Sequence, residues 1–344
     1  MILARVRLSL TLLTALLSLP ITHVARAAEA PPRGIGRTVA AAEAFLATID
    51  PAARSKGVFA FDDAVQKQRW SNLPSGIYQR VGFRLADLTK AQRDAALQLL
   101  EAVLSPSGYQ KVVGIMEGDE QLKGGGPGGR VLFGRDEYFL AFLGTPSATR
   151  PWRIQFGGHH LALNITLAGD QGTLTPSHTA SQPAKFTLEG KTIRPLGGET
   201  DRAFALMEAL TPAQQKQAIL GSKFRDLVLG PGQDGKSIAP EGVRVSSFTA
   251  AQRELLLALA REWVGILPDA SAEPKMAEIK SGLEETWFAW SGPTAPGSAA
   301  YFRIQGPTVF IEYAPQTLGG DATQHIHTMY RDPSNEYGAK WLKP

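Results

Sequence analysis

The sequence predicts an α+β fold in which a unit of helix plus antiparallel sheet occurs twice around one shared core, roughly over residues 86–167 and 245–314. Two observations support this prediction. Three segments share one sequence pattern typical of a helix start. A strand-like block of sequence repeats downstream of the first and third of these segments. The chain has 344 residues, of which 43% are apolar, so it is long enough to bury such a core.

The three predicted helix starts each place a threonine at the N-cap and a glutamine three residues later, which is the pattern of a capping box. An apolar residue precedes each threonine, at the position of a hydrophobic staple. Pro212 suits the first turn of the second helix, because the N–H that proline lacks would have no partner there. The three segments are residues 88–92, 210–214 and 248–252.

The repeated block reads as antiparallel strands that turn at glycines. Its matching pairs are residues 139–146 with 287–293, 152–155 with 302–305, and the following runs 159–167 and 308–314. If the first of these runs is a strand, alternation places His159 on its apolar side and His160 on its polar side. The adjacent glycines can introduce a bulge that re-aims either ring.

Residues 1–27 are typical of a signal peptide. Basic residues precede an apolar core at 8–19, and residues 25–27 supply the small side chains of a cleavage site. The apolar run is shorter than the roughly twenty residues that a spanning helix needs, so a retained membrane anchor is the weaker alternative. We therefore expect residues 28–344 to be exported, periplasmic or secreted, as a single globular domain with no membrane span.

The charge and the cysteine count exclude several classes of function. The formal net charge is +4, and loss of Arg5, Arg7 and Arg26 with the leader lowers it by three, to +1. Because no dense Lys/Arg stripe remains, we expect no nucleic-acid partner. The absence of cysteine excludes disulfides, thiolate metal sites and a cysteine nucleophile.

Two pairs of histidines predict a metal site. His159 and His160 follow two glycines, and His325 and His327 lie two residues apart, so a strand would present both of the latter on one face. Imidazoles suit a divalent transition metal, with Zn²⁺ preferred and iron as an alternative. Glu312, a charge inside an apolar strand, is the expected carboxylate, although an arginine partner would serve it equally well. Solvated or hydrogen-bonded histidines are the structural alternative.

Other polar residues invite weaker interpretations. Arg331 and Asp332 follow the second histidine pair and are expected to orient an anionic group or an imidazole, with a salt-bridged turn as the equal alternative. Residues 116–120 gather three carboxylates, which suits a hard-cation site or an acid/base pair, but a solvated loop is favoured there. His178 follows Thr-Pro-Ser and is expected in a surface loop.

Several motifs resemble an uncharacterised family, domain of unknown function 3500. They are residues 76–80, 107–112, 152–166, 311–313, 325–328 and 331–338. The resemblance extends over roughly 40–343, with mild departures at 329–330 and at Glu336. The resemblance implies that these motifs are parts of one family pattern. It implies no activity, cofactor or substrate, because the family has no established activity.

Three hypotheses follow from these patterns. The first is an exported metal-dependent enzyme, hydrolytic in chemistry, in which His160, His325 and His327 hold the ion and Glu312 is a fourth ligand or the general base. Its partner is a small-molecule substrate of unknown identity. The second is a non-catalytic exported protein that binds a metal or a small ligand. In the third, the histidines only hydrogen-bond within a polar core.

Overall fold

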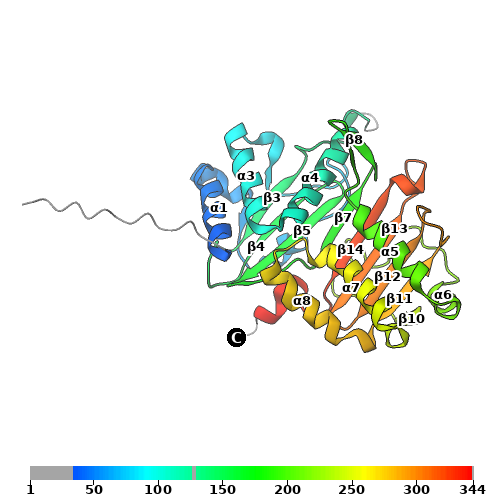
Figure 1. Cartoon of the computed structure of the whole chain (residues 1–344). Helices are drawn as coiled ribbons and strands as arrows, with labels where there is room; N and C mark the ends of the chain where they lie inside the picture. Colours follow the sequence, from blue (N-terminus) through cyan, green and yellow to red (C-terminus); the bar gives the residue numbers. More distant parts are fainter. Residues whose placement is uncertain (1–33, 126–128, 343–344) are drawn as a thin grey trace, which may run out of the picture. The chain divides into compact units, whose positions relative to one another are not determined.

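The computed structural model describes residues 34–125 and 129–342 (Figure 1). The predicted leader, residues 1–27, lies outside the described residues, as does part of the glycine-rich segment at 124–129. Among the residues described, no helix combines the length and the hydropathy that crossing a membrane requires.

The fold is mixed α+β, and its centre is one large, mostly antiparallel sheet of 12 strands. The strand order is β1-β3-β4-β5-β7-β14-β13-β12-β11-β10, with β2 beside β3 and β6 beside β5. The strands are β1 (Val58–Phe59), β2 (Phe83–Arg84), β3 (Phe139–Leu143), β4 (Trp152–Gly158), β5 (Leu161–Ala168), β6 (Gln171–Thr173), β7 (Ser177–Ser181), β10 (Val243–Arg244), β11 (Trp287–Ser291), β12 (Tyr301–Gly306), β13 (Val309–Pro315) and β14 (Ile326–Arg331). A separate hairpin joins β8 (Phe186–Leu188) to β9 (Lys191–Ile193).

After the first two, the α-helices come in consecutive pairs between strands along the chain. The α-helices are α1 (Ile35–Ala47), α2 (Ala64–Lys67), α3 (Lys90–Val103), α4 (Pro106–Gln121), α5 (Gly197–Ala209), α6 (Pro212–Ala218), α7 (Ala250–Val264) and α8 (Asp269–Ser281). Short 3-10 turns are η1 (Pro51–Lys56), η2 (Leu85–Asp87), η4 (Val245–Ser247), η5 (Leu283–Glu285), η6 (Ala322–Gln324) and η7 (Glu336–Trp341).

All three predicted capping boxes are confirmed. In α3, α6 and α7 the N-cap threonine accepts a hydrogen bond from the backbone N–H of the glutamine, and the glutamine side chain accepts one from the threonine N–H. Pro212 occupies the first turn of α6, as expected. Local sequence alone therefore determined where these helices begin.

Helices cover one face of the sheet, and the apolar side chains lie between the two layers. Figure 1 shows α3, α4, α5 and α7 across this face. The buried apolar residues form two large clusters rather than the single core that was predicted. One joins α3 and α4 to β3–β5 through residues such as Leu99 and Ile154, and the other joins α5 and α7 to β11–β14 through residues such as Leu256 and Ile304.

The opposite face of the sheet is polar but still buried, because alternation along the same strands presents polar side chains to it. Arg153, Thr166 and Arg303 are among the residues there that lie out of solvent. Arg153 donates to Thr166 Oγ1 at 2.9 Å and to the Tyr337 carbonyl at 2.9 Å. Loops, the short helix α2 and the 3-10 turn η7 bring polar groups to this face, and Gln66 of α2 donates to Gln155 Oε1 there at 2.8 Å.

The two halves of the sheet meet where β7 pairs with β14 in antiparallel register, with Ala180 opposite His327. The elements β2-η2-α3-α4-β3-β4-β5-β7 and β10-η4-α7-α8-β11-β12-β13-β14 run in the same order in the two halves. The central pairing brings segments from the middle and the end of the chain side by side, which is what forms the candidate site.

We expect Thr249→Ala to lower the free energy of unfolding by about 1 kcal/mol, because the N–H of Gln252 at the start of α7 loses its acceptor. Thr249→Ser keeps the hydroxyl and serves as the matched control. Equilibrium denaturation in urea measures both. An alanine variant as stable as the serine variant would show that the box does not stabilise this helix.

Candidate metal centre

His159 and His160 form the two-residue turn between β4 and β5, so the predicted strand start at 159 is wrong. Gly158 pairs with Leu161 across this hairpin. His160 has a φ of 64°, a left-handed conformation that few residues other than glycine adopt. Its N–H donates to the Asn72 carbonyl at 3.1 Å, and its carbonyl accepts from Ala180 N–H at 2.8 Å. The turn is thus held from both sides.

The glycine before the turn is required by a close approach. A Cβ atom at Gly158 would lie 2.7 Å from the ring of Tyr138, which is closer than van der Waals contact allows. The Tyr138 hydroxyl in turn donates to the His159 carbonyl at 2.8 Å. These contacts fix the turn against β3, and the turn directs the two imidazoles.

Three imidazoles from the two histidine pairs converge. His160 Nε2 lies 3.0 Å from His325 Nε2, which lies 3.0 Å from His327 Nε2. The three residues are buried, and their ligand atoms all lie within 4.8 Å of one another. The prediction that folding brings the two distant pairs together is confirmed.

The outer nitrogens of two of these rings determine where their lone pairs point. His325 Nδ1 lies 2.7 Å from the Leu318 carbonyl oxygen, and His327 Nδ1 lies 3.1 Å from Asp226 Oδ1. A carbonyl and a carboxylate only accept hydrogen bonds, so both Nδ1 atoms carry the proton. With both Nδ1 atoms protonated, the Nε2 atoms of His325 and His327, 3.0 Å apart, can be bridged only by a cation, either a metal ion or one further proton.

The spacing fits a tetrahedral metal ion. Bonds of about 2.1 Å from nitrogen to zinc place two ligand nitrogens about 3.4 Å apart, and a displacement of a few tenths of an ångström from 3.0 Å achieves this. Burial lowers the pKa of His325 to about 4 and holds the pKa of His160 well below its usual value. Both rings are therefore neutral at physiological pH and available as ligands.

A buried carboxylate–imidazole pair adjoins the three rings. Asp119, on α4, lies with its Oδ1 2.5 Å from His159 Nδ1, and its Oδ2 accepts from Gly134 N–H at 2.9 Å. The His159 ring stacks on His160 with centroids 3.6 Å apart. Asp119, His159 and His160 form a second group that can hold a cation. The contact of 2.5 Å is nonetheless shorter than the spacing of two ligands on one ion, and it suits a hydrogen bond better.

His178 is not a surface residue, contrary to the prediction. It lies fully buried in β7, opposite Met329 of β14, with its ring centroid 5.3 Å from that of His327. Neither ring nitrogen has a hydrogen-bond partner among the described residues. Burial and the neighbouring imidazoles lower the pKa of this ring, so it is neutral.

Glu312 is not among the groups that converge with the imidazoles. Its carboxylate accepts from Val228 N–H at 2.9 Å, from Leu229 N–H at 2.8 Å and from the Tyr301 hydroxyl at 2.6 Å. These three hydrogen bonds satisfy the Glu312 carboxylate, for which the sequence analysis had expected a metal ion. Because Asp226 belongs to the same loop, Glu312 anchors the segment that presents a carboxylate to His327.

Arg331 and Asp332 are also engaged away from the histidines. Arg331 pairs with Glu336 and donates to the Gln233 carbonyl. Asp332 pairs with Lys275 and accepts from the N–H and hydroxyl of Ser334. This corresponds to the salt-bridged turn that was the alternative interpretation.

Sequence reasoning missed two residues of the site. Asp119 lies in the carboxylate-rich segment 116–120, which was expected to be a solvated loop and instead forms the buried end of α4. The acid/base interpretation of that segment was the available signal. Asp226 lies in a loop without periodicity, and nothing in the sequence marked it.

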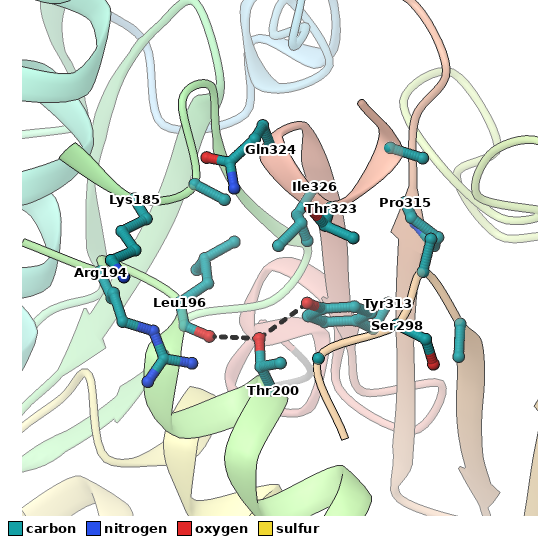
Figure 2. Close-up of a pocket in the computed structure, with 16 residues that line it drawn as sticks. Lys185, Arg194, Leu196, Thr200, Ser298, Tyr313, Pro315, Thr323, Gln324 and Ile326 are labelled. Carbon is teal, nitrogen blue, oxygen red and sulfur yellow. Dashed lines mark hydrogen bonds between the residues drawn. The ribbon is translucent and has the colours of Figure 1, made fainter. Parts of the chain in front are cut away.

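A cavity of about 370 Å³ lies near the same strands but does not contain the imidazoles (Figure 2). It is lined by Arg194, Thr200 and Tyr313, and the hydroxyls of the latter two are 2.7 Å apart. Ile326, between the two histidines, also lines it. Since alternate residues point to opposite faces, this cavity and the histidine cluster lie on opposite faces of β14.

Comparison with known proteins gives one match. The model of a family described as "Protein of unknown function (DUF3500)" matches residues 33–339, a range that contains every residue of the histidine cluster. Neither the curated proteins nor the solved structures give any match.

We expect the metal-free protein to lose stability as the pH falls from about 6.5 to about 4. The unfolded chain protonates its histidines near pH 6.5, whereas folded His325 stays neutral until about pH 4. The unfolded state therefore binds more protons in this window, and stability falls by roughly 1.4 kcal/mol per pH unit for each such histidine. Thermal unfolding as a function of pH measures this slope. His325→Gln should make it shallower, and an unchanged slope would contradict the assignment.

We expect Glu312→Gln to lower the free energy of unfolding by about 2 kcal/mol, because the amide group cannot accept all three hydrogen bonds that the carboxylate accepts. The number of metal ions bound per chain should not change. Chemical denaturation and metal analysis of one preparation separate the two effects. Loss of metal with unchanged stability would instead make Glu312 a ligand.

Proposed function

We propose a function for this chain, which belongs to the family of unknown function DUF3500: it is an exported metal-dependent hydrolase whose ion is held by His160, His325 and His327. The observation that carries the proposal is the convergence of Nε2 atoms at 3.0 Å, with the Nδ1 atoms of His325 and His327 held as donors by oxygen acceptors. The outer partners supply what metal-ligating histidines usually have, a carboxylate or a carbonyl on the second nitrogen.

The ligand set favours Zn²⁺. Three neutral imidazoles are a known catalytic zinc set and leave one coordination position for water or substrate. A bound Zn²⁺ supplies Lewis acidity and lowers the pKa of its water to about 7. Iron is the alternative, since imidazole nitrogens suit iron as well as zinc.

Residues around the proposed ion hold the imidazole ligands in position and supply a polar group beside them. The turn at His159 and His160 is fixed by backbone hydrogen bonds, so the His160 ring needs little reorganisation to bind. Asp226 and the Leu318 carbonyl orient the other two rings. The pair formed by Asp119 and His159 is a carboxylate-oriented imidazole beside the site, an arrangement used in general acid–base catalysis.

The second candidate is a non-catalytic exported protein that stores or binds a metal. The observation that favours it is burial, because His160 is 2% exposed and His325 is 5% exposed. A closed shell of four protein ligands would support storage, whereas a position open to water supports hydrolysis. Absorption spectroscopy of a Co²⁺-substituted protein separates the two candidates. Added azide changes the spectrum only if a coordination position on the ion is open to it.

Two further proposals concern the export of the chain and the internal duplication of its sheet. We propose export on the basis of residues 1–27, whose pattern is that of a cleaved leader. We also propose that the sheet arose by internal duplication. What supports this is the shared order of elements in the two halves and the repeated capping boxes of α3 and α7.

We expect the purified protein to bind about one Zn²⁺ per chain in equilibrium dialysis, and His325→Ala/His327→Ala to bind less than about a tenth of that. Circular dichroism shows whether the variant is folded. His325→Asn/His327→Asn, with smaller loss of side-chain volume, is the second variant. Absence of metal from the wild-type protein after dialysis against Zn²⁺ would refute the site.

A further inference from the structure

The loops around the histidine cluster carry exposed apolar side chains. Among the described residues, the exposed large hydrophobic side chains are Val65, Leu73, Ile77, Leu132, Ile219, Leu318 and Leu342. Four of these, Leu73, Ile77, Leu132 and Leu318, belong to three segments that contact the cluster, and they are 42%, 58%, 40% and 79% exposed. We call these four residues the apolar rim. Single exposed leucines need no explanation, but a group at one site does.

Each segment is tied to an imidazole by a specific contact. The Leu318 carbonyl is the acceptor for His325 Nδ1. Leu132 is followed by Phe133, whose ring centroid lies 4.9 Å from that of His159. Leu73 follows Asn72, whose carbonyl accepts from the N–H of His160. The apolar rim is therefore carried by three segments of the chain, each of which contacts one of the imidazoles or its backbone.

Two of these segments are also fixed to each other. Leu132 N–H donates to the Ser75 carbonyl at 2.9 Å, and the two residues form an isolated β-bridge. Arg80 donates from one nitrogen to the carbonyls of Leu73 and Gly158, at 2.6 and 2.7 Å. The loop that carries Leu73 and Ile77 is thus held against the histidine turn, so their exposure is a property of an ordered segment.

The charges near the cluster do not suit a polyanionic ligand. Arg80 is buried, with one terminal nitrogen on carbonyls and the other without a partner among the described residues, and Asp226, beside His327, is a half-exposed carboxylate. A phosphate-rich ligand would be repelled by that carboxylate. An uncharged apolar group would instead remove area on Leu73, Leu132 and Leu318 from water.

We propose that the metal centre acts on substrates that carry an apolar alkyl or aryl group next to the bond to be cleaved, and that the apolar rim binds this group. This inference rests on the proposed metal centre. It narrows the substrate class to amphiphilic esters or amides, in which the polar group reaches the ion and the hydrocarbon lies over the loops.

Alkyl hydroxamates of increasing length test the inference, because their common head group binds Zn²⁺ and only the tail differs. We expect octanohydroxamate to bind the zinc-loaded protein more tightly than acetohydroxamate, by about twofold to fourfold per added methylene. Leu73→Ser/Ile77→Ser/Leu132→Ser should abolish this gain and leave the affinity for acetohydroxamate unchanged. Val65→Ser/Ile219→Ser, which changes exposed apolar residues outside the rim, should behave as wild type.

Calorimetry gives the dissociation constants, and circular dichroism verifies that the variants are folded. Ile77→Ser alone, at a position that is 58% exposed, should lose part of the gain and serves if the triple variant does not fold. Equal affinities for the two hydroxamates on wild-type protein, or a gain that survives in the triple variant, would overturn the inference alone. Failure of acetohydroxamate to bind, together with absence of zinc, would refute the metal centre itself and the inference with it.

Discussion

Two imidazoles whose outer nitrogens are held as donors can share the 3.0 Å between their inner nitrogens only through a cation, either a metal ion or a further proton, and much of the candidate site is explained by that constraint. The Leu318 carbonyl and Asp226 hold the protons of His325 and His327 on their outer nitrogens. Burial lowers the pKa values of His160 and His325, so these two rings are neutral and available as ligands.

The sheet brings these imidazoles together. β7 and β14 are far apart in the chain but adjacent in the sheet, and the hairpin turn between β4 and β5 reaches the same place because β5 pairs with β7. Long helices cover the apolar face of the sheet (Figure 1), whereas loops with short helical turns reach the polar face, to which His327 points. A polar face closed by loops is a usual place for function, since loops supply backbone carbonyls and carboxylates that helices do not.

The sequence predicted the features that depend on local pattern. The α+β class, the three capping boxes and the meeting of the two histidine pairs all agree with the structure. Alternation was correct for His325 and His327, which flank Ile326, but wrong for His159 and His160, because a two-residue turn interrupts the period. Glu312 was correctly recognised as a carboxylate in need of partners, yet a pattern cannot distinguish a metal from two backbone N–H groups. His178 and Asp226 depended on tertiary contacts that local patterns do not encode.

The two outer partners of the histidine pair differ in kind, and they differ in how substitution affects them. The Leu318 carbonyl belongs to the main chain, so substitution cannot remove it, whereas Asp226 is a side chain whose carboxylate is 54% exposed. Replacement of Asp226 would change how strongly His327 donates electrons while disturbing little packing. A single substitution at Asp226 would therefore change the pKa of water on a bound metal ion and leave the rest of the fold unchanged.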